Sequence, residues 1–210
     1  MKDEAGDVAE TAGAPAGRSG RGPGRDSRRE AVVEAAAALF AARGFDGVSM
    51  RDIARRAGML SGSLYYHFDS KEALFAEVHA AAVARVTARL DAALAESEGA
   101  PPWTRLEAAL RAHLEGLLEG PDGVALMSPD FPGERADLAR ELAAQRDAYE
   151  ARFRALIEAC GPRADVDRRL LRLFLFGALN WTPVWWRPGR GAELGEVAAA
   201  LADMLRRGAA

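Results

Sequence analysis

The sequence contains a single cysteine, Cys160, among its 210 residues. One cysteine excludes an intrachain disulfide and a cysteine-based metal cluster, and we interpret Cys160 as an inert residue at a helix end. No apolar run approaches the roughly 18–20 residues that a membrane span needs. Residues 1–10 are acidic and lack the apolar segment of a signal peptide. These absences predict a cytoplasmic protein that does not enter a membrane.

The common catalytic motifs are also missing. The sequence has no G-x-S-x-G, no P-loop, no H-E-x-x-H and no G-x-G-x-x-G that opens a helix after a strand. A hydrolase would need a nucleophile with a nearby base, and the chain has only His67, His79 and His113. We therefore expect no enzyme, no cofactor and no metal site.

Charge is distributed unevenly along the chain, whose net charge is −3. Residues 1–17 hold one lysine against four acidic residues, and residues 73–210 hold seventeen arginines against twenty acidic residues. Residues 18–72 hold ten basic against seven acidic residues. This small basic excess is suggestive of a polyanionic partner, although many solvated surfaces carry as much.

The arrangement of apolar residues predicts an all-α protein. Alanine and arginine are abundant while runs of Val, Ile and Thr are scarce, which favours helix over sheet. Residues 1–26 carry no periodic apolar face and are predicted to be a disordered tail. Residues 124–132 are expected to be short or irregular. Apolar spacing and helix-stop residues predict helices over 27–43, 50–57, 61–67, 71–96, 103–118, 133–160, 165–186 and 192–207.

Two short helices around Gly58, after a longer helix, form a helix-turn-helix pattern over residues 27–74. Ser49 is predicted to cap the first short helix, with Asp52 completing a capping box. A small core of Phe40, Phe45, Ile53, Leu64 and Phe68 would hold the helices. The exposed face of residues 61–67 would then reach phosphates and base edges, helped by the helix N-termini at residues 49–50 and 70–71.

The longer pattern resembles the signature of the TetR repressor family. It runs from Gly44-Phe45 through Val48-Ser49-Met50-Arg51-Asp52-Ile53-Ala54 and Ala57-Gly58 to Gly62-Ser63-Leu64-Tyr65-Tyr66-His67-Phe68-Asp69-Ser70-Lys71-Glu72-Ala73-Leu74. The resemblance implies DNA contacts by Gly62, Tyr65, Tyr66, His67 and Lys71. The full set of DNA-binding residues that we predict is Ser49, Met50, Arg51, Ser61, Gly62, Ser63, Tyr65, Tyr66, His67 and Lys71.

Three alternatives remain open in this region. The family usually has Ser or Thr where this chain has Leu60, so Ser61 either caps the recognition helix or contacts DNA. Tyr65 could belong mainly to the core, and His67 could be a satisfied turn residue. The arginines at 18, 21, 25, 28 and 29 could lie along phosphates or could belong to a solvated leader.

Residues 75–210 are predicted to form a C-terminal ligand-binding and dimerisation domain. Two apolar stripes of its last helices would form a four-helix interface between two subunits, as the TetR resemblance implies; the alternative is that they bury only the monomer core. The stripes consist of Leu170, Phe174, Gly177, Trp181 and Val184, and of Leu194, Val197, Leu201 and Leu205.

A small-molecule cavity is expected among the central helices. Asn180 beside Trp181 is the most unusual feature, because a buried Asn needs hydrogen-bond partners. The alternative for each wall residue is plain core. The candidate wall residues are Trp103, His113, Leu117, Met127, Phe131, Phe153, Phe174, Asn180, Trp181 and Trp185.

Two stretches of this chain resemble a particular TetR subgroup. Its members control steroid and fatty-acid catabolism and respond to acyl-CoA thioesters. The two stretches are residues 57–68 and the run Ala178-Leu179-Asn180-Trp181-Thr182 … Trp185-Trp186-Arg187-Pro188. The resemblance implies a small hydrophobic or acyl-CoA effector. Arg152, Arg154, Arg172 and Arg187 could bind its nucleotide, or could be solvated surface residues.

These observations predict a homodimeric repressor of palindromic operator DNA. Effector binding would move helix 71–96 and separate the two recognition helices, which need a spacing of roughly 34–36 Å on the operator. Rival interpretations are an enzyme, a helical adaptor that would show no salt-dependent DNA binding, and an activator with the same fold.

Overall fold

The computed structural model describes residues 25–118 and 135–209, and the predictions for residues 1–24, Met127 and Phe131 lie outside these ranges. The described residues form eight helices and no strand, apart from an isolated bridge between Arg187 and Arg190, in agreement with the predicted fold class. The helices are α1 (Arg25–Arg43), α2 (Met50–Arg56), α3 (Ser61–Tyr65), α4 (Lys71–Glu96), α5 (Pro102–Leu118), α7 (Ala136–Ala159), α8 (Arg168–Trp185) and α9 (Leu194–Ala209).

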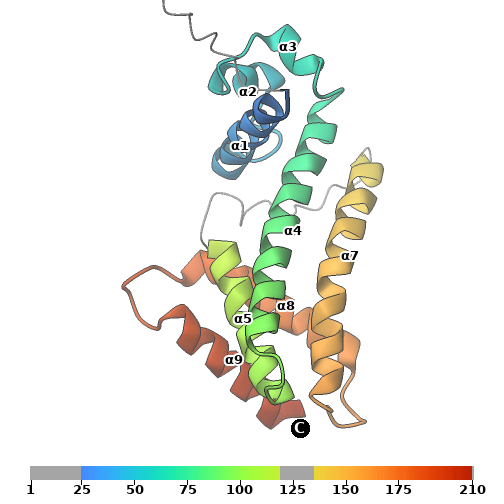
Figure 1. Ribbon diagram of the computed structural model, residues 1–210, viewed down its shortest axis with the longest axis vertical. Coiled ribbons are helices and arrows are strands. Elements are labelled where there is room, and N and C mark those ends of the chain that lie inside the picture. Colours follow the sequence, from blue (N-terminus) through green and yellow to red (C-terminus); the bar gives the residue numbers. More distant parts are fainter. Residues whose placement is uncertain (1–24, 119–134, 210) are drawn as a thin grey trace, which may run out of the picture.

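Helices α1, α2 and α3 gather at one end of α4, α7 runs alongside α4, and α5, α8 and α9 lie toward its other end (Figure 1). Where the predicted boundaries fall on described residues, they lie within three residues of the observed ones, and those of α4 coincide with them. α1 begins at Arg25 rather than residue 27, so the expected tail overlaps its first turn. α3 ends at Tyr65, and α8 begins only after Asp167, whose carboxylate accepts the Arg169 and Leu170 amides.

We call α1–α3 together with the first turns of α4 the head. Short-range sequence features determine its local structure. Ser49 and Asp52 form the predicted capping box, with both backbone-to-side-chain distances at 3.2 Å. Gly44 and Gly58 adopt φ of +68° and +67°, a left-handed conformation that glycine tolerates best. The five predicted core residues are all buried: Phe40, Phe45, Ile53, Leu64 and Phe68.

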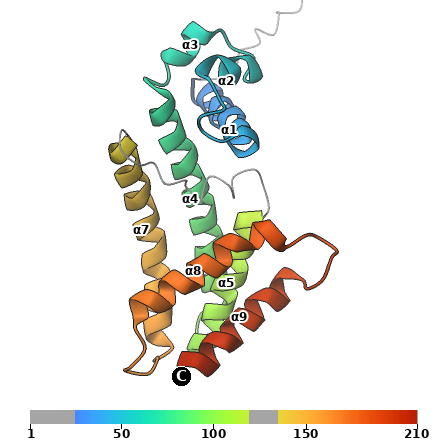
Figure 2. The same cartoon turned by 180° about the vertical axis from the view of Figure 1, so that it is seen from behind.

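The hydrophobic core has two clusters. One fills the head, and it includes Leu138 and Leu142 from the first turns of α7. The other lies among α4, α5, α7, α8 and α9 and is centred on Phe153, Leu110 and Leu179, which are fully buried. α8 crosses the other helices of this part, and α9 returns beside α5 (Figure 2). None of the helices in the described ranges is long and apolar enough to span a membrane.

Candidate functional site

Helix α3, the predicted recognition helix, lies at the extremity of the molecule (Figure 1). Leu64 is its only buried residue, while Tyr65 and Tyr66 are 56% and 72% exposed. Leu60 is the N-cap residue and offers no side-chain hydrogen bond to the helix. Ser61 therefore does not cap α3, and Leu60 is 80% exposed at its start.

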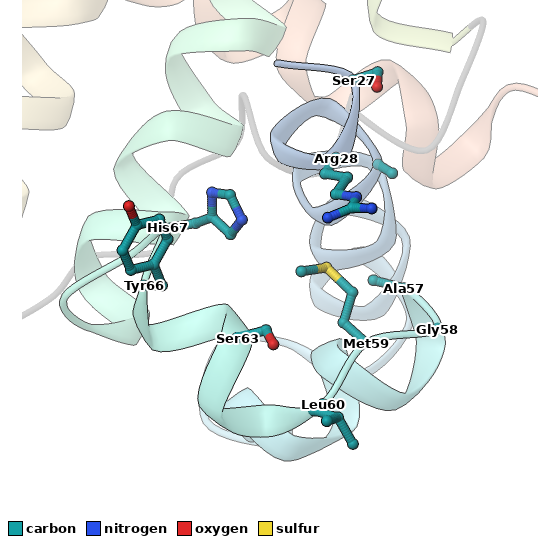
Figure 3. Close-up of a pocket in the computed structure, with 10 residues that line it drawn as sticks. Ser27, Arg28, Ala57, Gly58, Met59, Leu60, Ser63, Tyr66 and His67 are labelled. Carbon is teal, nitrogen blue, oxygen red and sulfur yellow. The ribbon is translucent and has the colours of Figure 1, made fainter. Parts of the chain in front are cut away.

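Open grooves lie on both sides of α3. One, of about 720 Å³, separates α3 from α1 and from the turn after α2; Figure 3 shows Arg28, Met59 and His67 pointing toward its centre, with Leu60 pointing away. The other, of about 760 Å³, lies between α3 and the N-terminus of α2. Most of the predicted DNA-binding residues line one of them: Ser63, Tyr66 and His67 the first, and Ser49, Met50, Arg51, Ser61, Tyr65 and Lys71 the second.

Three arginines around these grooves have no ion pair within the described part of the chain. Arg28 lines the first groove, Arg51 lines the second, and Arg56 is exposed at the end of α2. Arg29, by contrast, pairs with Glu77 and stacks on the Phe68 ring. The sequence pattern could not separate Arg28 from Arg29, and it gave no reason to single out Arg56.

Two of the predicted DNA-binding residues are turned inward. Met50 is 8% exposed and belongs to the head core. The Lys71 ammonium donates to the carbonyl oxygens of Phe45 and Val48, both at 3.0 Å, and lies 4.2 Å from the centre of the Phe45 ring. In this structure Lys71 therefore stabilises the loop that presents Ser49 and α2.

Helix α7 contacts the head directly, which the sequence did not predict. Arg135 donates to Asp46 at 2.7 Å, and its guanidinium lies 4.9 Å from the Phe45 ring centre. One turn further on, Leu138 and Leu142 enter the head core. The C-terminal part of the protein is thus connected to the head through both α4 and α7.

The predicted cavity-wall residues fall into two groups. Leu117, His113 and Phe153 are buried in the protein interior. Trp103 is half-buried and packs against the second core cluster, which contains Phe153. Phe174, Trp181 and Trp185 are exposed on α8. Within the described residues, these side chains therefore do not line a common cavity. Asn180 is half-buried and lies between the buried group and the exposed group.

A polar cluster joins α5, α7 and α8 inside the second core cluster. His113 Nδ1 lies 2.7 Å from the Tyr149 hydroxyl, and its Nε2 lies 3.3 Å from Asn180 Oδ1. Phe153 and Phe176 pack edge-on against the His113 ring. Burial lowers the pKa of His113 to about 4 and raises the pKa of Tyr149, so both are uncharged near neutral pH.

The predicted dimer stripe of α8 is exposed along its whole length. Leu170, Phe174, Trp181 and Val184 are 43–72% exposed, and Gly177 is exposed between them. The same face also carries Leu173 and Trp185, so it is broader than the predicted stripe, while the four predicted α9 residues pack half-buried against their own core cluster. The most exposed large apolar residue of α9 is instead Met204.

A basic groove of about 310 Å³ lies where α7 meets the start of α8. Two of the arginines proposed for nucleotide binding, Arg154 and Arg172, line it. Arg172 is paired there with Glu150. The other two proposed arginines do not line the groove: Arg152 pairs with Asp91, and Arg187 donates to backbone carbonyls. The remaining basic residues of the groove are Arg168, paired with Glu158, and Arg169.

Comparison with known proteins identifies the family. Residues 32–78 match the bacterial regulatory proteins of the tetR family, and residues 99–209 match the tetracyclin repressor-like C-terminal domain. The chain belongs to the TetR family of DNA-binding transcriptional regulators, as the sequence predicted.

Individual relatives agree with this assignment. The chain is 31% identical to the HTH-type transcriptional repressor KstR2 of Rhodococcus jostii (strain RHA1), over 89% of this chain and 93% of that protein. The structure of the ketosteroid transcriptional regulator KstR2 of Mycobacterium tuberculosis is 28% identical, with a TM-score of 0.66 over 88% of this chain and 95% of that chain. AibR, solved in complex with isovaleryl coenzyme A and operator DNA, shares the fold at 22% identity, with a TM-score of 0.71 over 84% of this chain and 97% of that chain.

Proposed function

We propose that the protein is a homodimeric repressor that binds palindromic operator DNA in the cytoplasm and is released by an acyl-CoA thioester. The observation that carries the DNA-binding half is the placement of α3 at the extremity of the molecule, between two open grooves. Arg28 and Arg51 line those grooves without ion pairs in the described chain, so they are available for phosphates. Ser63 on α3 and Tyr66 at its C-cap are exposed and can reach base edges.

The exposed face of α8 supports a homodimer. Large apolar side chains occupy it from Leu170 to Trp185, and monomers rarely leave such a continuous patch exposed. Pairing this face with its copy would bury it around a twofold axis and set the two recognition helices on the same side of the DNA.

An acyl-CoA effector is supported by chemistry at the junction of α7 and α8. A thioester needs an apolar site for the acyl chain and cationic groups for the phosphates of the nucleotide. The aromatic residues of the second core cluster are our candidates for the first role, and the groove containing Arg154 and Arg169 is our candidate for the second. AibR demonstrates that this fold can hold an acyl-CoA while also binding DNA.

Release would be transmitted by α7 together with α4. The ligand region and the head share α7, because its first turns lie in the head core and Phe153 lies in the second cluster. A displacement of α7 would therefore move Arg135 away from Asp46 and disturb the loop before α2. An effective switch requires the effector to favour the released state by several kcal/mol, of the order of 5 kcal/mol for complete conversion.

The DNA-binding half can be tested with sequences selected from a random pool. We expect two inverted half-sites whose centres are separated by about one helical turn. Inserting five base pairs between the half-sites rotates one half-site to the opposite side of the DNA, and fluorescence anisotropy should then show a loss of affinity of at least a hundredfold. The same insertion outside the half-sites is the control. Equal affinity for both insertions would contradict binding as a dimer, and failure to select any sequence would favour the adaptor interpretation.

A further inference from the structure

The polar cluster of His113, Tyr149 and Asn180 has a fixed hydrogen-bond direction. A neutral imidazole has one N–H donor and one acceptor nitrogen. The Tyr149 hydroxyl is buried, and within the described chain His113 Nδ1 is its only hydrogen-bond partner, so Tyr149 donates to Nδ1. The proton of His113 then lies on Nε2, which donates to Asn180 Oδ1.

This direction determines what Asn180 can offer. Its carbonyl oxygen is occupied by His113, so the amide nitrogen with its two N–H donors points elsewhere. Within the described ranges that nitrogen makes no hydrogen bond, and Asn180 is only half-buried. Asn180 therefore presents unused donors at the border between the aromatic core and the exposed face of α8.

Stability alone does not explain such a cluster. Three apolar residues of similar size would fill the same space without any polar group to satisfy, and that exchange is often neutral or stabilising. The cluster does, however, hold the Asn180 side chain in one orientation, because its oxygen is bound to a buried ring wedged between Phe153 and Phe176. Recognition of a hydrogen-bond acceptor requires a donor group that its neighbours hold in a fixed orientation.

We propose that Asn180 is a specificity-determining residue whose amide donates a hydrogen bond to the carbonyl oxygen of the effector, with His113 and Tyr149 as positioning residues. This inference rests on the proposed acyl-CoA effector, whose thioester carbonyl is the acceptor. The aromatic side chains around the cluster would contact the acyl chain on one side of that carbonyl. The arginine-lined groove at the start of the same helix would take the phosphates on the other side.

The test compares pairs of ligands that differ only in the carbonyl. Each acyl-CoA, with isovaleryl, octanoyl and stearoyl chains, is paired with the S-alkyl-CoA thioether of the same length, in which a methylene replaces the carbonyl. Dissociation constants are measured by calorimetry on the full-length protein. For at least one chain length the unmodified protein should bind the thioester about tenfold more tightly, as one buried hydrogen bond is worth.

Two variants test the contribution of the Asn180 side-chain amide. Asn180→Asp keeps an oxygen for His113 but removes the N–H donors, and Asn180→Ala removes the whole group in case the carboxylate perturbs folding. Both should bind the thioether like the unmodified protein and lose the preference for the thioester. Thr182→Val is the matched control, since the one hydrogen bond of its hydroxyl within the described residues goes to Ala178 of the same helix, and it should keep the preference. Circular dichroism checks that every variant is folded.

The outcomes separate this inference from the proposed function. If the unmodified protein binds no ligand of either series, the acyl-CoA effector and the role of Asn180 are both overturned. If it binds thioester and thioether equally, the effector stands and the role of Asn180 falls. A preference that survives in Asn180→Asp and Asn180→Ala, or an equal loss for both members of each pair, assigns Asn180 a purely structural role.

Discussion

Replacing Lys71 with methionine separates the DNA contact that the family resemblance implies from the stabilising contacts that the structure shows for this side chain. In the structure its ammonium donates to two carbonyls at 3.0 Å and stacks on Phe45. Hydrogen bonds from a charged donor contribute about 1.5–3 kcal/mol each when buried, and less here because the site is half-exposed. With about 0.5–1 kcal/mol from the cation–π contact, Lys71→Met should lower the free energy of unfolding by about 2–3 kcal/mol.

Arg51→Met is the matched control for this experiment. Arg51 is exposed and makes no ion pair within the described residues, so its replacement should change stability by less than about 0.5 kcal/mol. It should instead weaken DNA binding and reduce the slope of log affinity against log salt by about one for each protomer.

Urea unfolding and DNA anisotropy, measured at one fixed protein concentration because the protein is proposed to dimerise, distinguish the two roles. We expect Lys71→Met to be mainly a stability variant and Arg51→Met a binding variant. If Lys71→Met unfolds at the same urea concentration as the unmodified protein and loses only DNA affinity, the inward role of Lys71 is refuted.

The remaining predictions concern other parts of the molecule. Leu60→Thr should stabilise α3 by about 0.5–1 kcal/mol through a new N-cap, seen as a higher melting temperature, and should weaken operator binding if Leu60 contacts a thymine methyl group. Arg135→Ala should weaken operator binding even without effector, because it removes the contact with Asp46 whose loss is proposed to accompany release, and it should reduce the further effect of the effector, with Asp46→Ala behaving alike; unchanged operator affinity with a full effector response would contradict coupling through α7. Trp181→Glu should give a folded monomer in light scattering, because it places a charge inside the proposed interface, and an unchanged dimer mass would place the interface elsewhere. His113 has a pKa lowered to about 4 in the fold, so the unfolded chain binds a proton first as the pH falls below 6.5. Stability should fall by up to about 3 kcal/mol between pH 6.5 and 4, and His113→Gln should flatten this part of the profile.

Features that depend on neighbouring residues could be predicted from the sequence. The capping box of Ser49 and Asp52 and the left-handed turn at Gly58 each involve a few consecutive positions, and the structure contains both. The small head core followed from helical spacing within a short stretch, and all five of its predicted residues are buried.

Features that depend on distant residues could not be predicted. Arg135 and Asp46 are 89 positions apart, and nothing in either local pattern indicates the other. The direction of Lys71 was missed for a related reason, since its partners are loop carbonyls 23 and 26 positions away that carry no sequence signature.

An amphipathic pattern also cannot tell which partner covers it. The stripes of α8 and α9 have similar apolar spacing, yet that of α8 is exposed and that of α9 packs half-buried against its own subunit. Leu173, which the predicted α8 stripe omits, is as exposed as Leu170, and Met204 is more exposed than any residue of the predicted α9 stripe. The assignment of these residues to a dimer interface remains a prediction.

The central claim is that an acyl-CoA thioester releases the protein from its operator. The most direct measurement is fluorescence anisotropy of the protein on labelled DNA from upstream of its own gene, or on the selected palindrome. The complex is titrated with CoA esters of increasing chain length, with free coenzyme A and with the matching free acids. We predict that at least one ester raises the dissociation constant for DNA tenfold or more while free coenzyme A and the free acids leave it unchanged. A complex that forms tightly but is insensitive to every ester, or that free coenzyme A releases equally well, would contradict the claim.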